Sequence, residues 1–161
     1  MPGRIILLRH GQTHSNVSRL LDTRPPGAEL TDLGRNQATE VGRELAGFVG
    51  EREVEFKCSI ALRAQQTATL AARAFEQERN LPRFSIPIDV IPNVQEIFAG
   101  DWELDASEAA HRSHDMAMRG WCYGDSQAAM EGGVATRPLA DLEAYEEQLQ
   151  QFVYHSGAFM K

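Results

Sequence analysis

The sequence predicts an α/β fold, a three-layer sandwich in which helices flank a mostly parallel central sheet. Residues 5–8 are four large apolar residues in a row, which is typical of a short strand buried on both faces. A second short strand is predicted at residues 56–60, and amphipathic helices are predicted at residues 32–49 and 61–79. Strand, helix, strand and helix in this order favour right-handed crossovers between parallel strands.

The length and composition indicate one domain spanning residues 1–161. Apolar residues make up 42% of the chain and charged residues 24%, the balance of an ordinary folded protein. The net charge of −7 argues against a nucleic-acid binder, which needs a basic face. Cys58 and Cys122 are too far apart in sequence to indicate a zinc site or a disulfide framework. Without a membrane-span or signal-peptide pattern, we expect a cytoplasmic protein with no membrane partner.

The first half of the chain contains clear helix signals. Residues 11–30 are polar and rich in turn-forming residues, so they predict a loop over the end of the first strand. Thr31 is a good N-cap for the helix over residues 32–49, where apolar residues recur at helical spacing. The helix over residues 61–79 is predicted from its many alanines and straight-chain residues.

The second half of the chain is less regular. Residues 86–91 include a proline and predict a short or edge strand. Residues 94–103 form an apolar and acidic loop with too many large side chains for a solvent linker, so we expect it to pack against the protein. A weakly patterned helix is predicted over residues 105–119, and a last amphipathic helix is predicted to begin near Thr136.

Polar residues that can bind phosphate follow the first strand. Arg9, His10 and Gly11 would lie at its carboxyl end, where open α/β sheets bind ligands. Arginine can hold a phosphate in two places, histidine brings a nucleophilic nitrogen, and glycine allows a close approach. The strand alone leaves open the alternative of a strand that simply ends in polar loop residues. Arg63, at the start of the helix after the second strand, adds a second cation.

Four segments of the chain, in order, resemble the histidine phosphatase superfamily, also called the phosphoglycerate-mutase-like family. Residues 9–13 (RHGQT), with Asn16, are similar to the first signature of the family. Residues 59–68 (SIALRAQQTA) are similar to the second signature, and residues 30–38 lie between them with an L-T-x-x-G-x-x-Q-A pattern. Residues 95–103 (QEIFAGDWE) resemble the acidic loop of the family. Four such segments together are much more specific than the RHG triplet alone.

The resemblance implies a phosphoryl-transfer enzyme that uses no metal and no other cofactor. Its nucleophile would be His10, which would carry the phosphoryl group as a phosphohistidine. A transferring phosphoryl group needs cations and hydrogen-bond donors around its oxygens. The matching phosphate ligands in this sequence are Arg9, Arg63, Asn16 and Thr13.

Glu96 matches the residue that would give a proton to the leaving group. Among Ile97, Phe98 and Trp102, its carboxyl group is expected to have a raised pKa, which suits a general acid. The alternative is an ordinary surface glutamate on a loop.

The C-terminal region departs from the family pattern. The family has a second catalytic histidine after a late strand, and His155 is the candidate for it, but only six residues follow it. Either His155 completes the site within a shortened or incomplete C-terminal region, or the chain is a divergent copy with a damaged pocket. A missing last strand would expose a sheet edge, which favours a homodimer.

Three further histidines are predicted to have no catalytic role. His14 is expected to be a pocket wall or a solvated residue. His111 and His114 have a spacing that would suit metal ligation, but without a visible third ligand they predict the solvated face of a helix.

The sequence therefore favours a phosphatase that acts on a small phosphorylated substrate. A phosphoglycerate-type phosphomutase and a protein-phosphohistidine phosphatase are alternatives within the same chemistry. An alternative of another class is a catalytically weakened domain that binds phosphorylated ligands.

Overall fold

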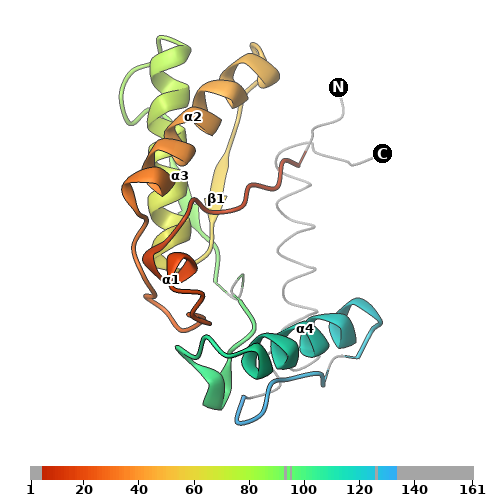
Figure 1. Ribbon diagram of the computed structural model, residues 1–161. Helices are drawn as coiled ribbons and strands as arrows, with labels where there is room; N and C mark the ends of the chain where they lie inside the picture. The colour runs from red at the N-terminus through yellow and green to blue at the C-terminus, as the bar shows by residue number, and fades with distance from the viewer. Residues whose placement is uncertain (1–4, 93, 95, 126, 134–161) are drawn as a thin grey trace.

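The computed structural model describes residues 5–92, 94, 96–125 and 127–133 (Figure 1). Its helices and strands, in chain order, are α1 (His14–Val17), α2 (Asp32–Val49), β1 (Phe56–Cys58), α3 (Leu62–Glu78), β2 (Ile88–Val90), the 3-10 helix η1 (Gly100–Trp102) and α4 (Glu108–Cys122). Strands β1 and β2 pair in parallel, with Phe56 opposite Ile88 and Cys58 opposite Val90. The helix expected from Thr136, and His155, lie outside the described residues.

Helices α2 and α3 lie side by side and form one half of the structure (Figure 1). The Thr31 side chain accepts a hydrogen bond from the Gly34 backbone N–H, which is the N-cap that the sequence predicts. Gly42 faces the backbone of α3, because a Cβ there would collide with the carbonyl oxygen of Ala71. This close approach requires glycine in the middle of a helix.

Two glycines of α2 are expected to respond in opposite ways to alanine. We expect Gly42→Ala to destabilise the protein by about 1–3 kcal/mol, because the added methyl overpacks the contact with α3. Gly47 has open space around it, so Gly47→Ala is expected to stabilise the helix by about 0.5–1 kcal/mol. Urea unfolding of both variants measures the difference, and equal effects of the two substitutions would contradict the close packing at Gly42.

A core between α2, α3 and the sheet is built around Phe75. Its buried members are Ala46, Val49, Phe75 and Ile86. The Phe56 ring of β1 packs edge-on against Phe75, with ring centroids 6.0 Å apart. This core joins the two predicted strands to the helix between them.

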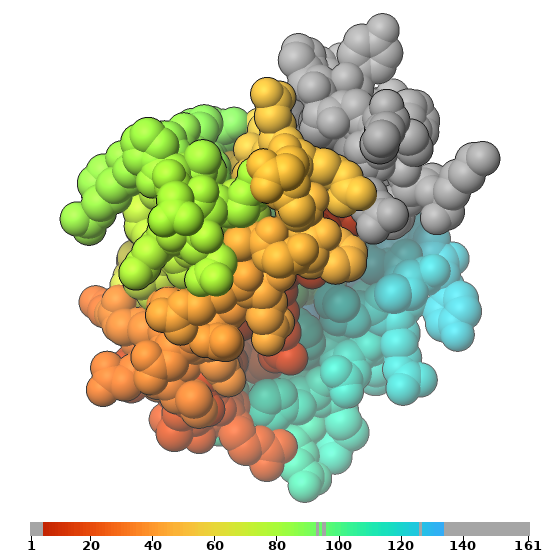
Figure 2. Space-filling view, turned by 90° about the horizontal axis from the view of Figure 1, so that it is seen from above, coloured from red at the N-terminus to blue at the C-terminus, as the bar shows by residue number. Residues whose placement is uncertain are grey.

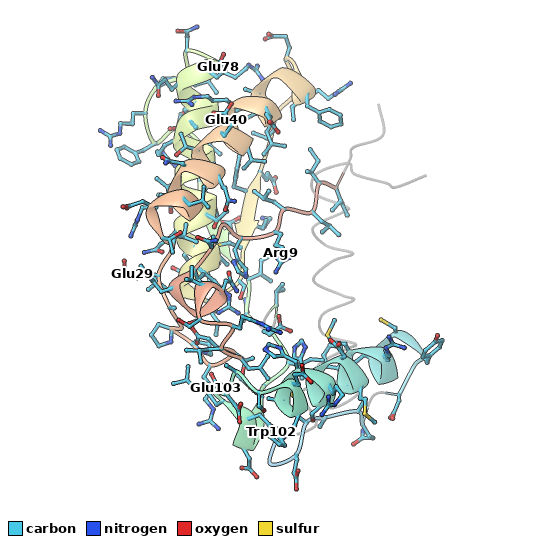
Figure 3. All side chains as sticks on the ribbon, viewed as in Figure 1. Arg9, Glu29, Glu40, Glu78, Trp102 and Glu103 are labelled. Carbon is cyan, nitrogen blue, oxygen red and sulfur yellow. The ribbon has the colours of Figure 1, made fainter. Side chains whose placement is uncertain are left out.

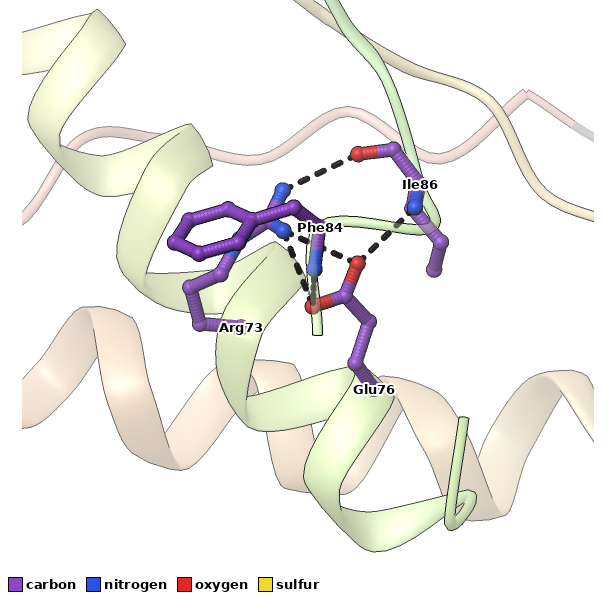
Figure 4. A network of polar contacts seen from close by, with 4 residues as sticks. All are labelled: Arg73, Glu76, Phe84 and Ile86. Carbon is purple, nitrogen blue, oxygen red and sulfur yellow. Dashed lines mark hydrogen bonds and ion pairs between the residues drawn. The ribbon is translucent and has the colours of Figure 1, made fainter. Parts of the chain in front are cut away.

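A buried carboxylate ties the loop after α3 back to this helix (Figure 4). Glu76 is 1% exposed and accepts hydrogen bonds from the backbone N–H groups of Phe84 (3.0 Å) and Ile86 (2.8 Å). The Arg73 guanidinium donates to both Glu76 oxygens, at 3.0 and 2.9 Å, and to the Ile86 carbonyl at 2.9 Å. The network therefore sets the position from which β2 begins.

Loss of this carboxylate is expected to be costly. We expect Glu76→Ala to destabilise the protein by about 3–5 kcal/mol, because it leaves Arg73 and two backbone donors without their acceptor. Glu78→Ala, at an exposed position on the same helix, is expected to stay within about 0.5 kcal/mol of the parent. Urea denaturation of both variants checks the prediction, and similar midpoints would contradict it.

Helix α4 and the acidic loop form a second core. Its buried residues are Leu21, Ile97, Ala99, Ala110, Ala117 and Met130, and Trp102 and Trp121 pack against them. The expectation that residues 94–103 pack against the protein is therefore confirmed. Seen from above, α2 and α3 lie on one side and α4 on the other, with N-terminal residues between them (Figure 2).

The opening segment differs from the prediction. Residues 5–10 lie in neither a helix nor a strand, and Ile6, Leu7 and Leu8 are 44%, 88% and 41% exposed. The predicted doubly buried strand at residues 5–8 is therefore wrong in this structure. The reason is that no other part of the described chain pairs with this segment, and a strand needs a ladder partner for its backbone groups.

None of the described helices is both long enough and apolar enough to cross a membrane.

Candidate active site

A cavity of about 590 Å³ lies where the N-terminal segment, the start of α3 and α4 meet. Six of the predicted site residues line it, namely Arg9, His10, Thr13, Asn16, Arg63 and Glu96. They come from segments up to about half the chain apart, so the fold brings the sequence motifs together. Figure 3 shows Arg9 between the α2–α3 pair and α4, where the two halves of the molecule face each other.

The ring of His10 is held in one orientation. Its Nδ1 lies 2.8 Å from the Gly11 carbonyl oxygen, and because a carbonyl can only accept, Nδ1 carries the hydrogen and donates. The second ring nitrogen, Nε2, is then the unprotonated one and is free to attack. Burial lowers the pKa of His10, and the cations Arg63 and Arg9 lower it further. The neutral, nucleophilic form is therefore favoured at neutral pH.

Gly11 fixes the backbone next to His10. A Cβ at Gly11 would collide with the Gly34 carbonyl oxygen, so the segment touches the first turn of α2. The Gly11 N–H donates to the Thr67 hydroxyl at 3.1 Å, and this hydroxyl donates to the Arg63 carbonyl at 2.8 Å. One chain of contacts thus joins the residue after His10 to the turn of α3 that carries Arg63.

The two arginines differ in how they are held. Arg63 is 8% exposed, and its guanidinium donates to the Asp22 carbonyl at 3.1 Å, which leaves its other N–H groups for a ligand. Gly27 lies against the same guanidinium. Arg9 is exposed, and within the described part of the chain it forms no ion pair. Both cations are therefore able to bind a phosphate group.

Thr13 and Asn16 form a capping box at the start of α1. The Thr13 hydroxyl accepts from the Asn16 backbone N–H at 3.1 Å, and the Asn16 side-chain oxygen accepts from the Thr13 N–H at 3.0 Å. Because the cap uses the oxygen of Asn16, its NH₂ group is available to a ligand in the cavity. The buried Thr13 side chain also helps to keep Asn16 in place.

The loop that carries Glu96 is braced by a second carboxylate. Glu103 accepts hydrogen bonds from the Thr23 N–H at 2.8 Å, the Thr23 hydroxyl at 2.5 Å and the Arg24 N–H at 3.0 Å. The Thr23 hydroxyl in turn accepts from the Ala99 N–H at 2.8 Å. These bonds link the acidic loop to the loop beside Arg63. Glu103 lies near η1 at one end of the molecule (Figure 3).

The carboxylate of Glu96 has partners that the sequence did not suggest. It accepts from its own neighbour, the Ile97 N–H, at 3.0 Å, and its Oε1 lies 3.6 Å from Nε2 of His114 in an ion pair. His114 lowers the pKa of Glu96 more strongly than burial raises it. The expected rise in the pKa of Glu96 is therefore wrong, because a cation from α4 outweighs the apolar neighbours.

Both histidines of α4 line the cavity, which corrects the prediction of a solvated helix face. His111 donates through Nε2 to the Arg19 carbonyl at 2.9 Å. Glu96 raises the pKa of His114, so the charged form of this ring is favoured. The spacing of three residues was the signal that both rings share one side of the helix. His14 is exposed and does not line the cavity.

Comparison with known proteins identifies the family. The model of the histidine phosphatase superfamily (branch 1) matches residues 5–150. The chain belongs to the histidine phosphatase superfamily. The resemblance stated from the motifs is therefore confirmed.

The relatives of this superfamily member include phosphatases. It is 26% identical over 156 residues to the adenosylcobalamin/α-ribazole phosphatase of Escherichia coli, an alignment that covers 97% of this chain and 68% of the relative. The α-ribazole phosphatase structure from Shigella flexneri is 26% identical, with a TM-score of 0.60, over 91% of this chain and 67% of that one. These matches confirm the expectation of a phosphatase of this superfamily.

The fold class is confirmed by a more distant structure. The phosphoglycerate mutase from Bacillus anthracis superposes on this chain with a TM-score of 0.64 at 17% identity, covering 93% of this chain and 69% of that one. At this identity the likeness concerns the fold alone. Together with the parallel pairing of β1 and β2, it supports the α/β class predicted from the sequence.

Sequence reasoning missed three residues that hold the candidate site of this histidine phosphatase together. Asp22 accepts from the Ser15 hydroxyl and the Ala28 N–H, both at 2.6 Å, and its carbonyl binds Arg63. Thr23 and Glu103 link two loops that are 80 residues apart in sequence. The sequence does show an acidic residue, Asp22 or Glu103, in each of the two loops beside the motifs. Nothing in the sequence indicates which residues these carboxylates contact.

Proposed function

We propose that this chain is a phosphatase that hydrolyses a small phosphate monoester through a phosphohistidine on His10. The observation that carries the proposal is the fixed ring of His10, with Nδ1 bound to the Gly11 carbonyl, in a cavity that also holds Arg9 and Arg63. A nucleophile in the required tautomer and two cations for the phosphoryl oxygens are what the chemistry needs. The reaction requires no metal and no other cofactor.

The reaction has two steps. Nε2 of His10 attacks phosphorus in line with the ester bond, and the bond to the leaving oxygen breaks. Arg9, Arg63 and the Asn16 amide hold the phosphoryl oxygens, while Thr13 supports Asn16. Glu96 gives a proton to the leaving oxygen. A water molecule then attacks the phosphohistidine, loses its proton to Glu96 and releases inorganic phosphate.

His155 is proposed as the second histidine of the site, as an additional donor to the phosphoryl oxygens. If it has this role, we expect His155→Ala to lower the rate by on the order of a hundredfold. Unchanged turnover by this variant would remove His155 from the site and leave Arg9 and Arg63 as the cations.

The substrate is proposed to be a small molecule rather than a nucleic acid. The name of the Escherichia coli relative makes α-ribazole phosphate a first compound to test. Phosphomutase activity is the main alternative, although the likeness to the Bacillus anthracis mutase concerns the fold alone.

We also propose that the protein is cytoplasmic and that it forms a homodimer through its exposed apolar residues, Ile6 to Leu8.

Phosphate release tests the proposed function. The protein is incubated with p-nitrophenyl phosphate, α-ribazole 5′-phosphate, a phosphoglycerate and a phosphohistidine peptide, each with and without EDTA. We expect turnover that EDTA does not reduce, with release of inorganic phosphate from at least one small ester. Interconversion of phosphoglycerate isomers without net phosphate release would favour the mutase, and binding without turnover would favour the weakened domain.

A further inference from the structure

Glu96 must itself receive a proton before it can protonate the leaving group. The carboxylate ion-pairs with His114 and accepts from the Ile97 N–H, and both contacts favour its ionised form. An ionised carboxylate has no proton to give. The nearest group in the ion pair that carries one is the ring of His114, at Nε2.

His114 is placed so that it can transfer a proton to Glu96. It lies on α4, whose packing against the acidic loop is secured by the core around Ile97 and Ala110. The two side chains are 20% and 40% exposed, so the pair opens on the cavity instead of being sealed in the core. A closer approach of less than 1 Å brings Nε2 and Oε1 to ordinary hydrogen-bonding distance.

We propose that His114 is a positioning residue for Glu96 that also stores the proton which Glu96 passes to the leaving group. The inference rests on the proposed phosphatase function. It gives His114 of α4 a role in proton transfer, whereas the sequence predicted that this histidine lies on the solvated face of a helix.

Binding of the phosphate would trigger the transfer. The charged groups around Glu96 are His114 from α4, Arg63 from α3 and His10 from the N-terminal segment, and Asp115 also acts on His114. Arg63 favours the ionised form of Glu96. A phosphate dianion bound to Arg63 offsets this cation, which raises the proton affinity of Glu96.

The protons balance over the cycle. Nε2–H of His114 gives its proton to Oε1 of Glu96, and His114 becomes neutral. Glu96 then protonates the oxygen of the leaving group as the bond to phosphorus breaks. In the second step, the attacking water gives a proton to Glu96, which returns it to His114 and restores the ion pair.

The test compares two substrates that differ in their need for a proton. The leaving group of p-nitrophenyl phosphate departs readily as an anion, whereas that of an alkyl phosphate such as glycerol phosphate needs a proton. We expect His114→Gln, which removes the proton but keeps a polar side chain, to lower kcat/KM for the alkyl phosphate by about 100-fold. For p-nitrophenyl phosphate we expect a change of less than about threefold, since the acid contributes little there. Arg112→Gln, at an exposed position on the same helix, is the control and should leave both rates unchanged.

The pH profile gives a second readout that a merely structural role would not move. In the parent, activity on the alkyl phosphate should fall as the pH rises through the pKa of His114, which Glu96 raises above its ordinary value. In His114→Gln this alkaline limb should move toward acid pH, because Glu96 alone loses its proton there. An NMR titration of the His114 ring should show its pKa falling in Glu96→Gln, whether or not the protein is active.

The outcomes separate the two proposals. A parent protein without turnover on either substrate contradicts the proposed function and the inference that rests on it. An active parent with equal losses on both substrates in His114→Gln, or with no loss, contradicts the proton store alone. A titration of His114 that does not respond to Glu96→Gln also overturns it.

Discussion

Replacement of His10 by alanine is expected to lower kcat for phosphate release by on the order of 10⁴-fold or more, because no nucleophile remains to accept the phosphoryl group. The ring is part-buried and its Nδ1 is hydrogen-bonded to the Gly11 carbonyl, so we expect its loss to leave the surrounding packing largely intact. The measurement is phosphate release by the purified variant on p-nitrophenyl phosphate, beside urea unfolding to show that the fold is kept.

His14 provides the matched control. It lies four residues further along, is exposed and does not line the cavity. We expect His14→Ala to retain the activity of the parent within about twofold, because surface substitutions away from a site change little. Comparable losses in both variants would mean that the effect at His10 is structural, and would contradict its role as nucleophile.

Removal of the Arg63 guanidinium is expected to give the second largest loss. We expect Arg63→Ala to reduce kcat/KM by about 10²–10³-fold, since a buried cation that holds the phosphoryl oxygens acts mainly in the transition state. Arg63→Lys should recover only part of this activity, because a single ammonium cannot reproduce the forked donors of arginine. The same variants should bind inorganic phosphate more weakly, as measured by product inhibition.

The control for Arg63 is an arginine outside the site. Arg43 lies on the exposed face of α2 and pairs with Glu40 at 2.9 Å. Arg43→Ala should leave kcat/KM unchanged. If Arg63→Ala unfolded at a much lower urea concentration than Arg43→Ala but kept its activity, the contact with the Asp22 carbonyl would be the main role of Arg63.

Local signals in the sequence predicted the elements that carry most of the site. Thr31 caps α2 as expected, and α3 begins at Leu62, one residue before Arg63. Capping and helical periodicity depend on residues a few positions apart, so they can be read from the chain directly. The motif around His10 and the motif around Arg63 also lead to one cavity.

The structure of the opening segment, residues 5–8, could not be predicted in the same way. Four apolar residues indicate burial, but burial of a strand depends on the partner beside it, and no local pattern names that partner. In the structure, Leu7 is 88% exposed. Arg9 and His10 line the cavity, so the motif and the cavity coincide, whereas the environment of the segment that precedes them was not predicted.

The electrostatics of Glu96 depend on a contact between separate elements. Its apolar neighbours in sequence suggested a raised pKa, whereas the ring of His114, on α4, lowers it. Likewise, nothing near Thr23 in sequence indicates that Glu103 binds it. Long-range pairs of polar side chains follow from packing and cannot be inferred from spacing along one chain.

Detection of the phosphorylated intermediate tests the central claim most directly. The protein is mixed with p-nitrophenyl phosphate, quenched in alkali during turnover and analysed by mass spectrometry of its peptides. We predict a phosphoryl group on His10, absent from His10→Ala and still present in His14→Ala. A phosphoryl group on another residue, or turnover by His10→Ala at the rate of the parent, would contradict the account.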